Sequence, residues 1–340
     1  MKQTKLFALL MSAVLVLGLA ACGEKGGNSA GSSSAVSSQA AEPAAYSIAA
    51  LKGPTAMGLV KLMHDAEGGE DLANDYTFSL AASPDEVTPK LIQGELDMAC
   101  VPANLAAVLY QKTEGEIVTL AVNTLGVLYI VEKGNAVQSL GDLAGMTIVS
   151  AGKGASPEQA LRYLLDKNGD SLGGNVTVDW KSEHSESVAA LASGAATVAL
   201  LPQPFVTVAQ TKVEGLRVAL DLNKEWDKLA DDGSSLVTGV IVARKDVVEE
   251  NPGAVEAFLK EYAASVDWVN GNVPEAAELI GSYGIVDAAV AEKALPACNI
   301  VCITGDEMKE KLSGYLSVLF EQDPQSVGGA LPEDVFYFGA

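Results

Sequence analysis

Short apolar runs alternate with helical runs along the chain from residue 46 onward. In the first part, apolar or alternating patterns predict four strands: Tyr46–Leu51, Tyr76–Ala81, Leu96–Val101 and Ile117–Val122. The segments between them have helical spacing and predict three helices: Thr55–Ala66, Ser83–Gln93 and Leu105–Gln111. Strands that alternate with helices in this way favour a parallel α/β sheet.

The same order of elements returns in the second part of the chain. It predicts four more strands, Met146–Val149, Val176–Trp180, Thr197–Leu201 and Leu216–Leu220, and two helices between them, Ser185–Ser193 and Phe205–Gln210. A shift of one hundred positions places Leu91 on Leu191, Gly94 on Gly194 and Pro102 on Pro202. Two copies of one strand–turn–helix plan predict two similar lobes.

Two further apolar strands, Gly126–Glu132 and Gly239–Ala243, stand outside the repeat and flank the second lobe. We interpret them as the two crossings between the lobes, which would form the hinge. Residues 46–131 and 238–340 are then predicted to form lobe 1, and residues 132–237 to form lobe 2. The helices predicted after Arg244 would return to lobe 1: Pro252–Val269, Pro274–Tyr283, Val286–Leu295 and Gly305–Phe320.

The stretch from Met146 to Leu165 reads as a buried strand, a glycine turn and a helix start. Ser156 occupies the expected N-cap position, with Pro157 at N1 and Gln159 at N3, which predicts a capping box. A helix that starts at the carboxyl end of a strand offers free N–H groups to a ligand. The alternative interpretation is an ordinary strand–helix turn with a good cap.

The first 45 residues do not resemble a folded domain. Residues 1–21 combine a basic start with a short apolar run, as a signal peptide does. Leu19-Ala20-Ala21-Cys22 resembles the bacterial lipobox, which implies cleavage before Cys22 and attachment of lipid, palmitate included, to Cys22. A plain secretory signal with a chance cysteine is the alternative. Residues 22–45 are rich in Gly, Ser and Ala and are predicted to form a flexible tether.

Composition excludes several classes of function. The chain has 44 acidic and 22 basic residues, a balance that disfavours nucleic acid and anionic membrane surfaces as partners. It has only two histidines, so a Cys/His metal cluster is not expected and no metal ligand is proposed. The four-residue spacing of Cys298 and Cys302 leaves open whether they form a disulfide.

No motif indicates an enzyme or a bound cofactor. The chain has no GxSxG elbow and no HExxH pair. The turn from Gly152 to Ser156, GKGAS, is neither a P-loop nor a dinucleotide-binding fingerprint, because the required glycine spacing is absent. We therefore expect a protein without cofactor that is not an enzyme.

Four segments carry a resemblance to a known family: SPDEVTPKLIQGELDMACVP, GDLAGMTIVSAGKGASPEQALRYLL, ALLPQPFVTVA and GVIVARKDVVEENPGAVEAFLKEY. With the lipobox before them, they resemble the substrate-binding proteins of bacterial ABC importers, in particular the nitrate/sulfonate/taurine and thiamine-pyrimidine-precursor group. The resemblance covers the chain from Tyr46 to about Phe320. It implies a type II periplasmic-binding-protein fold, an α/β fold in which two Rossmann-like lobes are joined by two hinge crossings.

The same resemblance implies a function and a location. The two lobes would close on a small-molecule ligand and deliver it to an ABC permease that is driven by its ATPase. The protein would be a monomer on the extracytoplasmic face of the cell membrane, anchored through the lipid on Cys22. The alternatives are a ligand-sensing receptor on the same fold and an enzyme similar to the pyrimidine synthases that are related to this group.

Open α/β sheets bind ligands outside the carboxyl ends of their strands. The turn residues there are the predicted ligand contacts: Thr55, Ala56, Ser83, Asn104 and Thr124 in lobe 1, and Gly154, Ala155, Ser156, His184, Gln203 and Thr238 in lobe 2 or its crossing. Each has a competing interpretation, because Ser83 and Ser156 could serve only as helix caps and His184 could be a solvated loop residue.

The class of ligand follows from the chemistry of these turns. Hydroxyls, amides and backbone N–H groups suit an anionic or a neutral polar ligand, such as a sulfonate or taurine-like anion or a pyrimidine-like ring. The only arginines are Arg162, Arg217 and Arg244, and none falls in a predicted cleft turn. This scarcity weakens the case for a strongly anionic ligand, and we expect a small polar organic solute.

Overall fold

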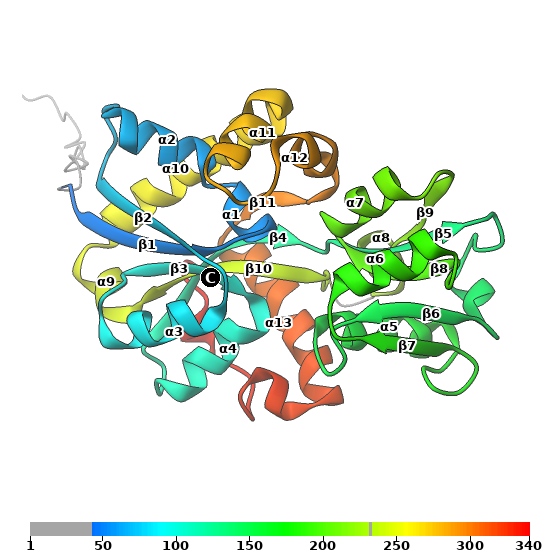
Figure 1. Ribbon diagram of the computed structural model, residues 1–340. Helices are drawn as coiled ribbons and strands as arrows, with labels where there is room; N and C mark the ends of the chain where they lie inside the picture. The colour runs from blue at the N-terminus through cyan, green and yellow to red at the C-terminus, as the bar shows by residue number, and fades with distance from the viewer. Residues whose placement is uncertain (1–42, 231–232) are drawn as a thin grey trace, which may run out of the picture. The chain divides into compact units, whose positions relative to one another are not determined.

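The computed structural model describes residues 43–230 and 233–340 (Figure 1). The predicted signal peptide, Cys22 and the tether up to residue 42 lie outside the described residues. None of the helices in the described part of the chain is long and apolar enough to span a membrane.

The first sheet has six strands in the order β11-β4-β10-β3-β1-β2. Their bounds are β1 Ala45–Leu51, β2 Asp75–Ala81, β3 Met98–Pro102, β4 Ile117–Leu125, β10 Val237–Arg244 and β11 Ile300–Ile303. Strands β1, β2 and β3 are parallel, as the alternation of strands and helices predicts. Strand β10, which the sequence placed outside the repeat, enters antiparallel between β3 and β4, so this sheet is mixed.

The second sheet has five strands in the order β7-β6-β8-β5-β9. Their bounds are β5 Leu128–Lys133, β6 Thr147–Ala151, β7 Thr177–Lys181, β8 Val198–Pro202 and β9 Leu216–Asp221. Strand β5 is antiparallel to both of its neighbours. The two crossing strands, β10 and β5, are each antiparallel to both of their neighbours, and in the first sheet the edge strand β11 is also antiparallel to β4.

The helices belong to two groups, one for each lobe (Figure 1). Those of the first lobe are α1 Pro54–Met57, α2 Val60–Gly68, α3 Pro84–Gln93, α4 Ala103–Lys112, α9 Lys245–Glu250, α10 Pro252–Gly271, α11 Val273–Ser282, α12 Ala288–Ala294 and α13 Gly305–Gln322. Those of the second are α5 Ser156–Asn168, α6 His184–Ser193, α7 Phe205–Lys212 and α8 Leu222–Leu229. Four short 3₁₀ helices are Leu140–Leu143, Leu295–Ala297, Pro324–Val327 and Asp334–Phe336.

The single helix predicted from Thr55 to Ala66 is divided into α1 and α2 at Gly58. A Cβ atom on Gly58 would lie 2.6 Å from the hydroxyl oxygen of Tyr262 on α10, so the backbone passes too close for a side chain. The carbonyl of Gly58 accepts a hydrogen bond from Ser265 at 2.6 Å. Contact with α10 therefore accounts for a break that local spacing does not predict.

The repeat at one hundred positions is confirmed. Strand β3 begins at Met98 and β8 at Val198, while α3 begins at Pro84 and α6 at His184. Both lobes therefore use one strand–turn–helix plan, and corresponding turns occupy corresponding places in the two sheets.

The chain passes between the sheets at two crossings. The first is Gly126 and Val127, between β4 and β5, and the second precedes β10. A Cβ atom on Gly126 would lie 2.7 Å from Leu236 of the second crossing, so the two crossings are in contact. All of β5 pairs within the second sheet, so strand pairing passes to the second sheet before residue 128.

The three cysteines of the described residues, Cys100, Cys298 and Cys302, are free thiols. The open question of a bridge between Cys298 and Cys302 is therefore answered, since neither is paired. The Sγ of Cys298 donates to the carbonyl of Ala294 at 3.3 Å, within its own helical segment. Cys100 is buried in β3, as expected for an apolar core position.

Candidate functional site

A cavity of about 290 Å³ lies between the two lobes, at the carboxyl ends of strands from both sheets. Its polar lining consists of Lys52, Thr55, Ser156, His184, Thr238 and Tyr315. Its apolar lining consists of Leu51, Pro54, Pro102, Val127, Leu128, Pro157, Pro202 and Leu236, with Gly53 beside them. Both crossings contribute to this lining, so a change in the angle between the lobes would change the cavity.

The turn between β1 and α1 forms the wall on the first lobe. Gly53 has φ 131° and ψ −160°, a backbone conformation that favours glycine. Thr55 follows Pro54, and its hydroxyl donates to the carbonyl of Leu51 at 3.0 Å. The hydroxyl proton of Thr55 therefore holds the turn, which leaves the hydroxyl oxygen as an acceptor.

Thr55 is held in place by close contacts from behind. A Cβ atom on Gly239 would lie 2.4 Å from the methyl carbon of Thr55 and 2.7 Å from Oδ1 of Asn123. The side-chain amide of Asn123 donates to the carbonyl of Thr55 at 3.1 Å. This part of the cavity wall therefore depends on a glycine in β10 and on a buried amide in β4.

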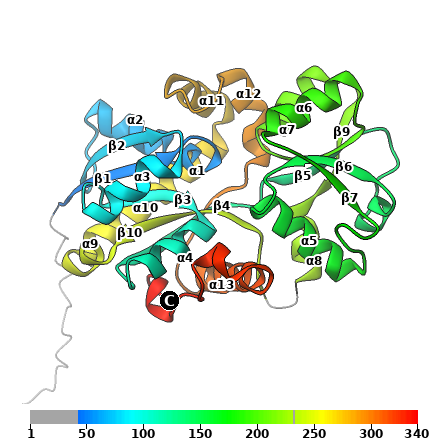
Figure 2. The same cartoon turned by 60° about the horizontal axis from the view of Figure 1, so that its bottom comes forward.

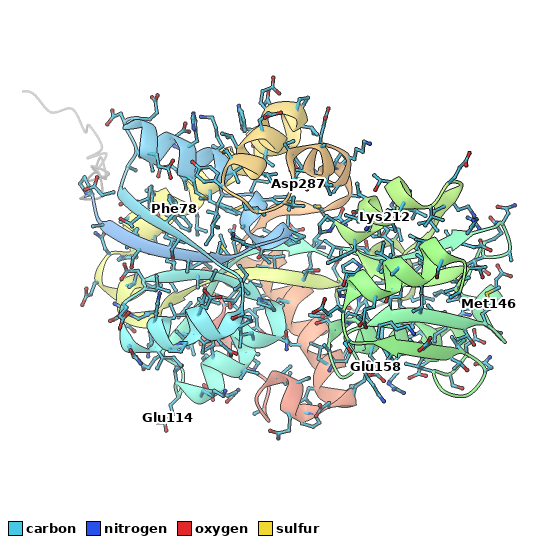
Figure 3. The ribbon with its side chains drawn as sticks, in the orientation of Figure 1. Phe78, Glu114, Met146, Glu158, Lys212 and Asp287 are labelled. Carbon is cyan, nitrogen blue, oxygen red and sulfur yellow. The ribbon has the colours of Figure 1, made fainter. Side chains whose placement is uncertain are left out.

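Helix α5 forms the facing wall and begins one residue earlier than predicted. Its N-cap is Ala155, and Ser156 is the first helical residue. Glu158 closes the cap, because its carboxylate accepts the N–H of Gly154 at 2.7 Å. The predicted capping box of Ser156 with Gln159 is therefore wrong. Figure 3 labels Glu158 in this first turn of α5.

Ser156, as the first residue of α5, lines the cavity. Its side chain interacts with that of Tyr315 of α13, which is buried. Burial raises the pKa of Tyr315 to about 12, and the side-chain hydrogen bond with Ser156 acts in the opposite direction. Tyr315 is therefore a protonated phenol at neutral pH. The sequence did not predict its place in the site, since it comes from a helix far along the chain.

His184 opens helix α6 at the edge of the same cavity. Its ring lies 5.2 Å from that of Phe205, centroid to centroid. Burial lowers the pKa of His184 below its ordinary value, which favours a neutral imidazole at neutral pH. Its buried Nδ1 has no hydrogen-bond partner among the described residues. Because His184 also lines the cavity, this nitrogen is a candidate hydrogen-bonding group for a ligand or a water molecule.

Four of the predicted contacts therefore meet in one place: Thr55, Ser156, His184 and Thr238. The other predicted residues do not line the cavity. Ala56 is fully buried beneath it. Ser83 is the N-cap of α3 and its N–H donates to the carboxylate of Glu86 at 3.1 Å, so it acts as the helix cap that the sequence also predicts.

The remaining polar candidates are used within the fold. The side-chain amide of Asn104 donates to the carbonyl of Ser326 at 3.3 Å. Thr124 is fully buried and donates to Asn123 at 3.0 Å. Gln203 accepts the hydroxyl of Thr207 at 3.0 Å.

Gly154 and Ala155 shape the turn before α5, where Gly154 has φ 76°. Neither residue lines the cavity, whose lining on this helix starts at Ser156.

The cavity has a mildly positive character. Lys52 is its only charged lining residue, and within the described chain it forms no ion pair. Helices α4, α5 and α6 begin at its edge, and the positive ends of their dipoles favour negative charge there. The three arginines pair with carboxylates elsewhere, through Arg162–Glu158, Arg217–Glu132 and Arg244–Asp246. The cavity therefore suits an anion of low charge or a polar neutral molecule.

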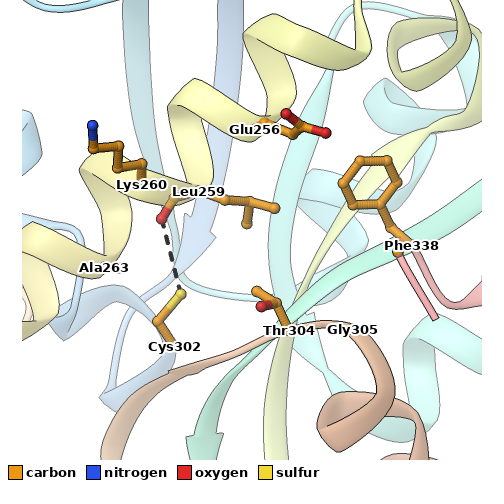
Figure 4. A pocket seen from close by; sticks show the side chains of 9 residues that line it. Glu256, Leu259, Lys260, Ala263, Cys302, Thr304, Gly305 and Phe338 are labelled. Atoms are coloured by element: carbon orange, nitrogen blue, oxygen red, sulfur yellow. Dashed lines mark hydrogen bonds between the residues drawn. The ribbon is translucent and has the colours of Figure 1, made fainter. Parts of the chain in front are cut away.

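A second cavity, of about 390 Å³, lies on the first lobe alone (Figure 4). It is lined by Glu256, Leu259 and Lys260 of α10, by Cys302, and by Phe338 near the C-terminus, among others. Burial raises the pKa of Cys302 to about 11, so its thiol is protonated and weakly reactive. Because this cavity receives nothing from the second lobe, movement of the lobes would not close it on a ligand.

Within residues 43–230 and 233–340, no group of three or more His, Cys, Asp or Glu side chains could hold a metal ion. The polar groups that the candidate site offers to a ligand are hydroxyl, imidazole, ammonium and backbone groups.

Comparison with known proteins supports this two-lobed architecture. The family model for ABC transporter, phosphonate, periplasmic substrate-binding proteins matches residues 70–294. The chain belongs to this family. The resemblance to ABC-importer substrate-binding proteins is thus confirmed, although the matching model is that of the phosphonate proteins. Since this is a family of solute-binding proteins, the expectation that the chain is not an enzyme is also confirmed, and an extracytoplasmic location agrees with it.

The curated relatives share only part of their sequence with this chain. A binding protein of Brucella abortus is 26% identical over 217 residues, which cover 62% of this chain and 64% of the relative. The chain therefore spans 64% of the length of the curated relatives that it matches.

Solved structures confirm the type II periplasmic-binding-protein fold. An ABC transporter from Parabacteroides distasonis has a TM-score of 0.73 and 23% identity, over 86% of this chain and 98% of that one. The periplasmic aliphatic sulphonate binding protein of Escherichia coli has a TM-score of 0.65 and 16% identity, over 86% and 90%. At these identities the likeness concerns the fold alone.

Proposed function

We propose that this protein captures a small organic solute between its two lobes and delivers it to the permease of an ABC importer. The observation that carries the proposal is the cavity built from both lobes and both crossings, with Lys52 and Thr55 on one side and Ser156 and His184 on the other. A ligand that contacts both walls would stabilise the closed arrangement, because only there does it bind both sets of groups.

The ligand is proposed to be a small phosphonate, a sulfonate or taurine-like anion, or a pyrimidine-like ring. Lys52 and the starts of α4, α5 and α6 favour an anionic group. The aliphatic wall, with Leu51, Leu128 and Leu236, favours a short apolar body on the same molecule. At about 290 Å³ the cavity is at the small end of the range of ligand sites, so a compact solute fits best.

The proposed partners and location follow from this role. The permease and its ATPase would receive the solute at the membrane, and the protein would act as a monomer held there by lipid on Cys22. Cys22→Ser should release the protein from the membrane fraction without changing its affinity for ligand. If the variant fractionates with membranes as the unaltered protein does, the lipid anchor is wrong while the binding role stands.

A thermal-unfolding screen tests the proposal. The compounds are methylphosphonate, methanesulfonate, taurine, nitrate and a set of pyrimidines. A ligand at one hundred times its Kd stabilises the folded state by about 2.7 kcal/mol, which the screen detects. Lys52→Gln should weaken binding of an anion, whereas Lys153→Gln, an exposed lysine outside the cavity, should not. A folded protein that none of these compounds stabilises would argue against capture of this class of solute.

A further inference from the structure

Tyr315 occupies a position shared by the two lobes and the cavity. It lies on α13, which packs against α4 of the first lobe and α5 of the second (Figure 2). Its side chain is only 1% exposed, yet it contributes to the cavity lining. A buried tyrosine needs a partner for its hydroxyl, and here that partner lies across the cleft.

On the cavity side, the side chain of Tyr315 interacts with Ser156, the first residue of α5, and both residues line the cavity. A hydrogen bond joins the same two helices, because the side-chain amide of Gln322 donates to the carbonyl of Gln159 at 3.1 Å. The bond at Gln322 lies away from the cavity lining. Of these two contacts, the one at Ser156 can therefore be altered directly by a ligand in the cavity.

On the opposite side, the ring of Tyr315 packs on Trp226 of α8, with ring centroids 5.6 Å apart. Trp226 is fully buried and packs in turn on Tyr163 of α5 at 4.1 Å. The indole N–H of Trp226 donates to the hydroxyl of Ser234 at 3.0 Å. Ser234 belongs to the second crossing, just before β10.

These contacts form one continuous path from the cavity to the second crossing: Ser156, Tyr315, Trp226 and Ser234. We propose that Tyr315 is a positioning residue that couples occupancy of the cavity to the second crossing through Trp226. A ligand that bonds Ser156 changes the partner of the Tyr315 hydroxyl. The ring then repacks against Trp226, because a dense core takes up discrete arrangements and does not deform continuously.

This inference rests on the proposed capture of a ligand, but its first test needs no ligand. The chain has three tryptophans, so Trp180→Phe with Trp268→Phe leaves Trp226 as the only one. In this background, Ser156→Ala should shift the emission spectrum of Trp226. Ser185→Ala, a change of an exposed serine on α6, should leave the spectrum unchanged. Equal spectra for the two variants would overturn the coupling.

The second test adds methylphosphonate and methanesulfonate as probes, with binding followed in parallel by calorimetry and by Trp226 emission. The two readouts should give the same Kd for the unaltered cavity. Tyr315→Phe keeps the ring and removes one hydrogen-bonding group, so Kd should rise about five-fold. The emission change on binding should be mostly lost in this variant, an effect that a purely structural role of the ring would not produce.

The outcomes separate this inference from the proposed function. Heat of binding without any change in Trp226 emission would overturn the coupling and leave solute capture intact. Absence of heat with either probe, together with a shift caused by Ser156→Ala, would support the path and count against the proposed ligands. An unchanged Kd and an unchanged emission response in Tyr315→Phe would overturn the role of Tyr315.

Discussion

Helices α3 and α6 begin one hundred positions apart, and their starts have nearly the same geometry. The N-cap of α3, Ser83, has φ −140° and ψ 155°, and the N-cap of α6, Glu183, has φ −136° and ψ 154°. In α3 the carboxylate of Glu86 accepts the N–H of Ala82 at 3.1 Å. In α6 the carboxylate of Glu186 accepts the N–H of Ser182 at 2.9 Å.

The two starts differ in the residue that follows the N-cap. Pro84 opens α3 and lies outside the cavity, whereas His184 opens α6 and lines it. The repeat therefore reproduces the backbone and its caps but not the chemistry at the cleft. At equivalent positions of the repeat, the second lobe therefore has a candidate binding residue, His184, and the first lobe has a structural residue, Pro84.

The largest expected effect comes from making α6 resemble α3. His184→Pro should preserve the helix start, because proline is favoured at N1 and Glu183 already has the extended backbone that must precede it. It removes the imidazole, so the affinity for ligand should fall about ten-fold, as the loss of one good hydrogen bond would cause. Calorimetric titration with a ligand found in the thermal screen measures this.

The reciprocal variant is its control. Pro84→His places an imidazole at the start of α3, outside the cavity, and should leave the affinity unchanged. An equal loss of affinity in both variants would mean that helix stability, and not the imidazole of His184, determines binding.

A smaller effect tests the shared part of the comparison. Glu86→Ala and Glu186→Ala each remove the carboxylate that caps a helix, so each should lower the free energy of unfolding by about 1 kcal/mol. Urea denaturation measures both variants. Strongly unequal losses would contradict the claim that the two helix starts are structurally equivalent.

The smallest effect concerns pH. Burial lowers the pKa of His184 from 6.5, so below that pH the unfolded chain binds a proton more readily than the folded one. The stability contribution of neutral His184 is therefore present above pH 6.5 and is lost as the pH falls toward the lowered pKa. The loss of unfolding free energy between about pH 7.5 and about pH 5.5 should be smaller in His184→Gln than in the unaltered protein.

His64→Gln changes the only other histidine of the sequence and is the matched control. If His64→Gln, and not His184→Gln, flattens the profile, His184 is not the group responsible. An anionic ligand in the cavity would favour the protonated imidazole, so its affinity should increase as the pH falls.

Local sequence patterns predicted the features that depend on residues close together in the sequence. The cap of α3 at Ser83 and the offset between the lobes were predicted correctly, and the ends of β3 and β8, predicted at Val101 and Leu201, lie one residue later. Helix caps, turns and hydrophobic periodicity depend on residues that are close in the sequence, so these features can be predicted without knowledge of the fold.

The features that were missed depend on distant residues. The antiparallel direction of β5 and β10 follows from the path of the chain between lobes, which strand patterns do not contain. Tyr315 reaches the cavity only through the packing of α13. The cap of α5 was misplaced by one residue because Glu158 takes the capping role that Gln159 was expected to have, and this choice depends on the turn at Gly154.

The central claim is that a ligand binds between the lobes, and hydrogen exchange with and without bound ligand tests it most directly. We predict that ligand slows exchange in residues 52–56, 156–160, 184–188 and 234–239, with little change in residues 256–263 of α10. Slowed exchange confined to residues 256–263 and 302–305, around the cavity of Figure 4, would contradict the claim and move the binding site to the outer side of the first lobe.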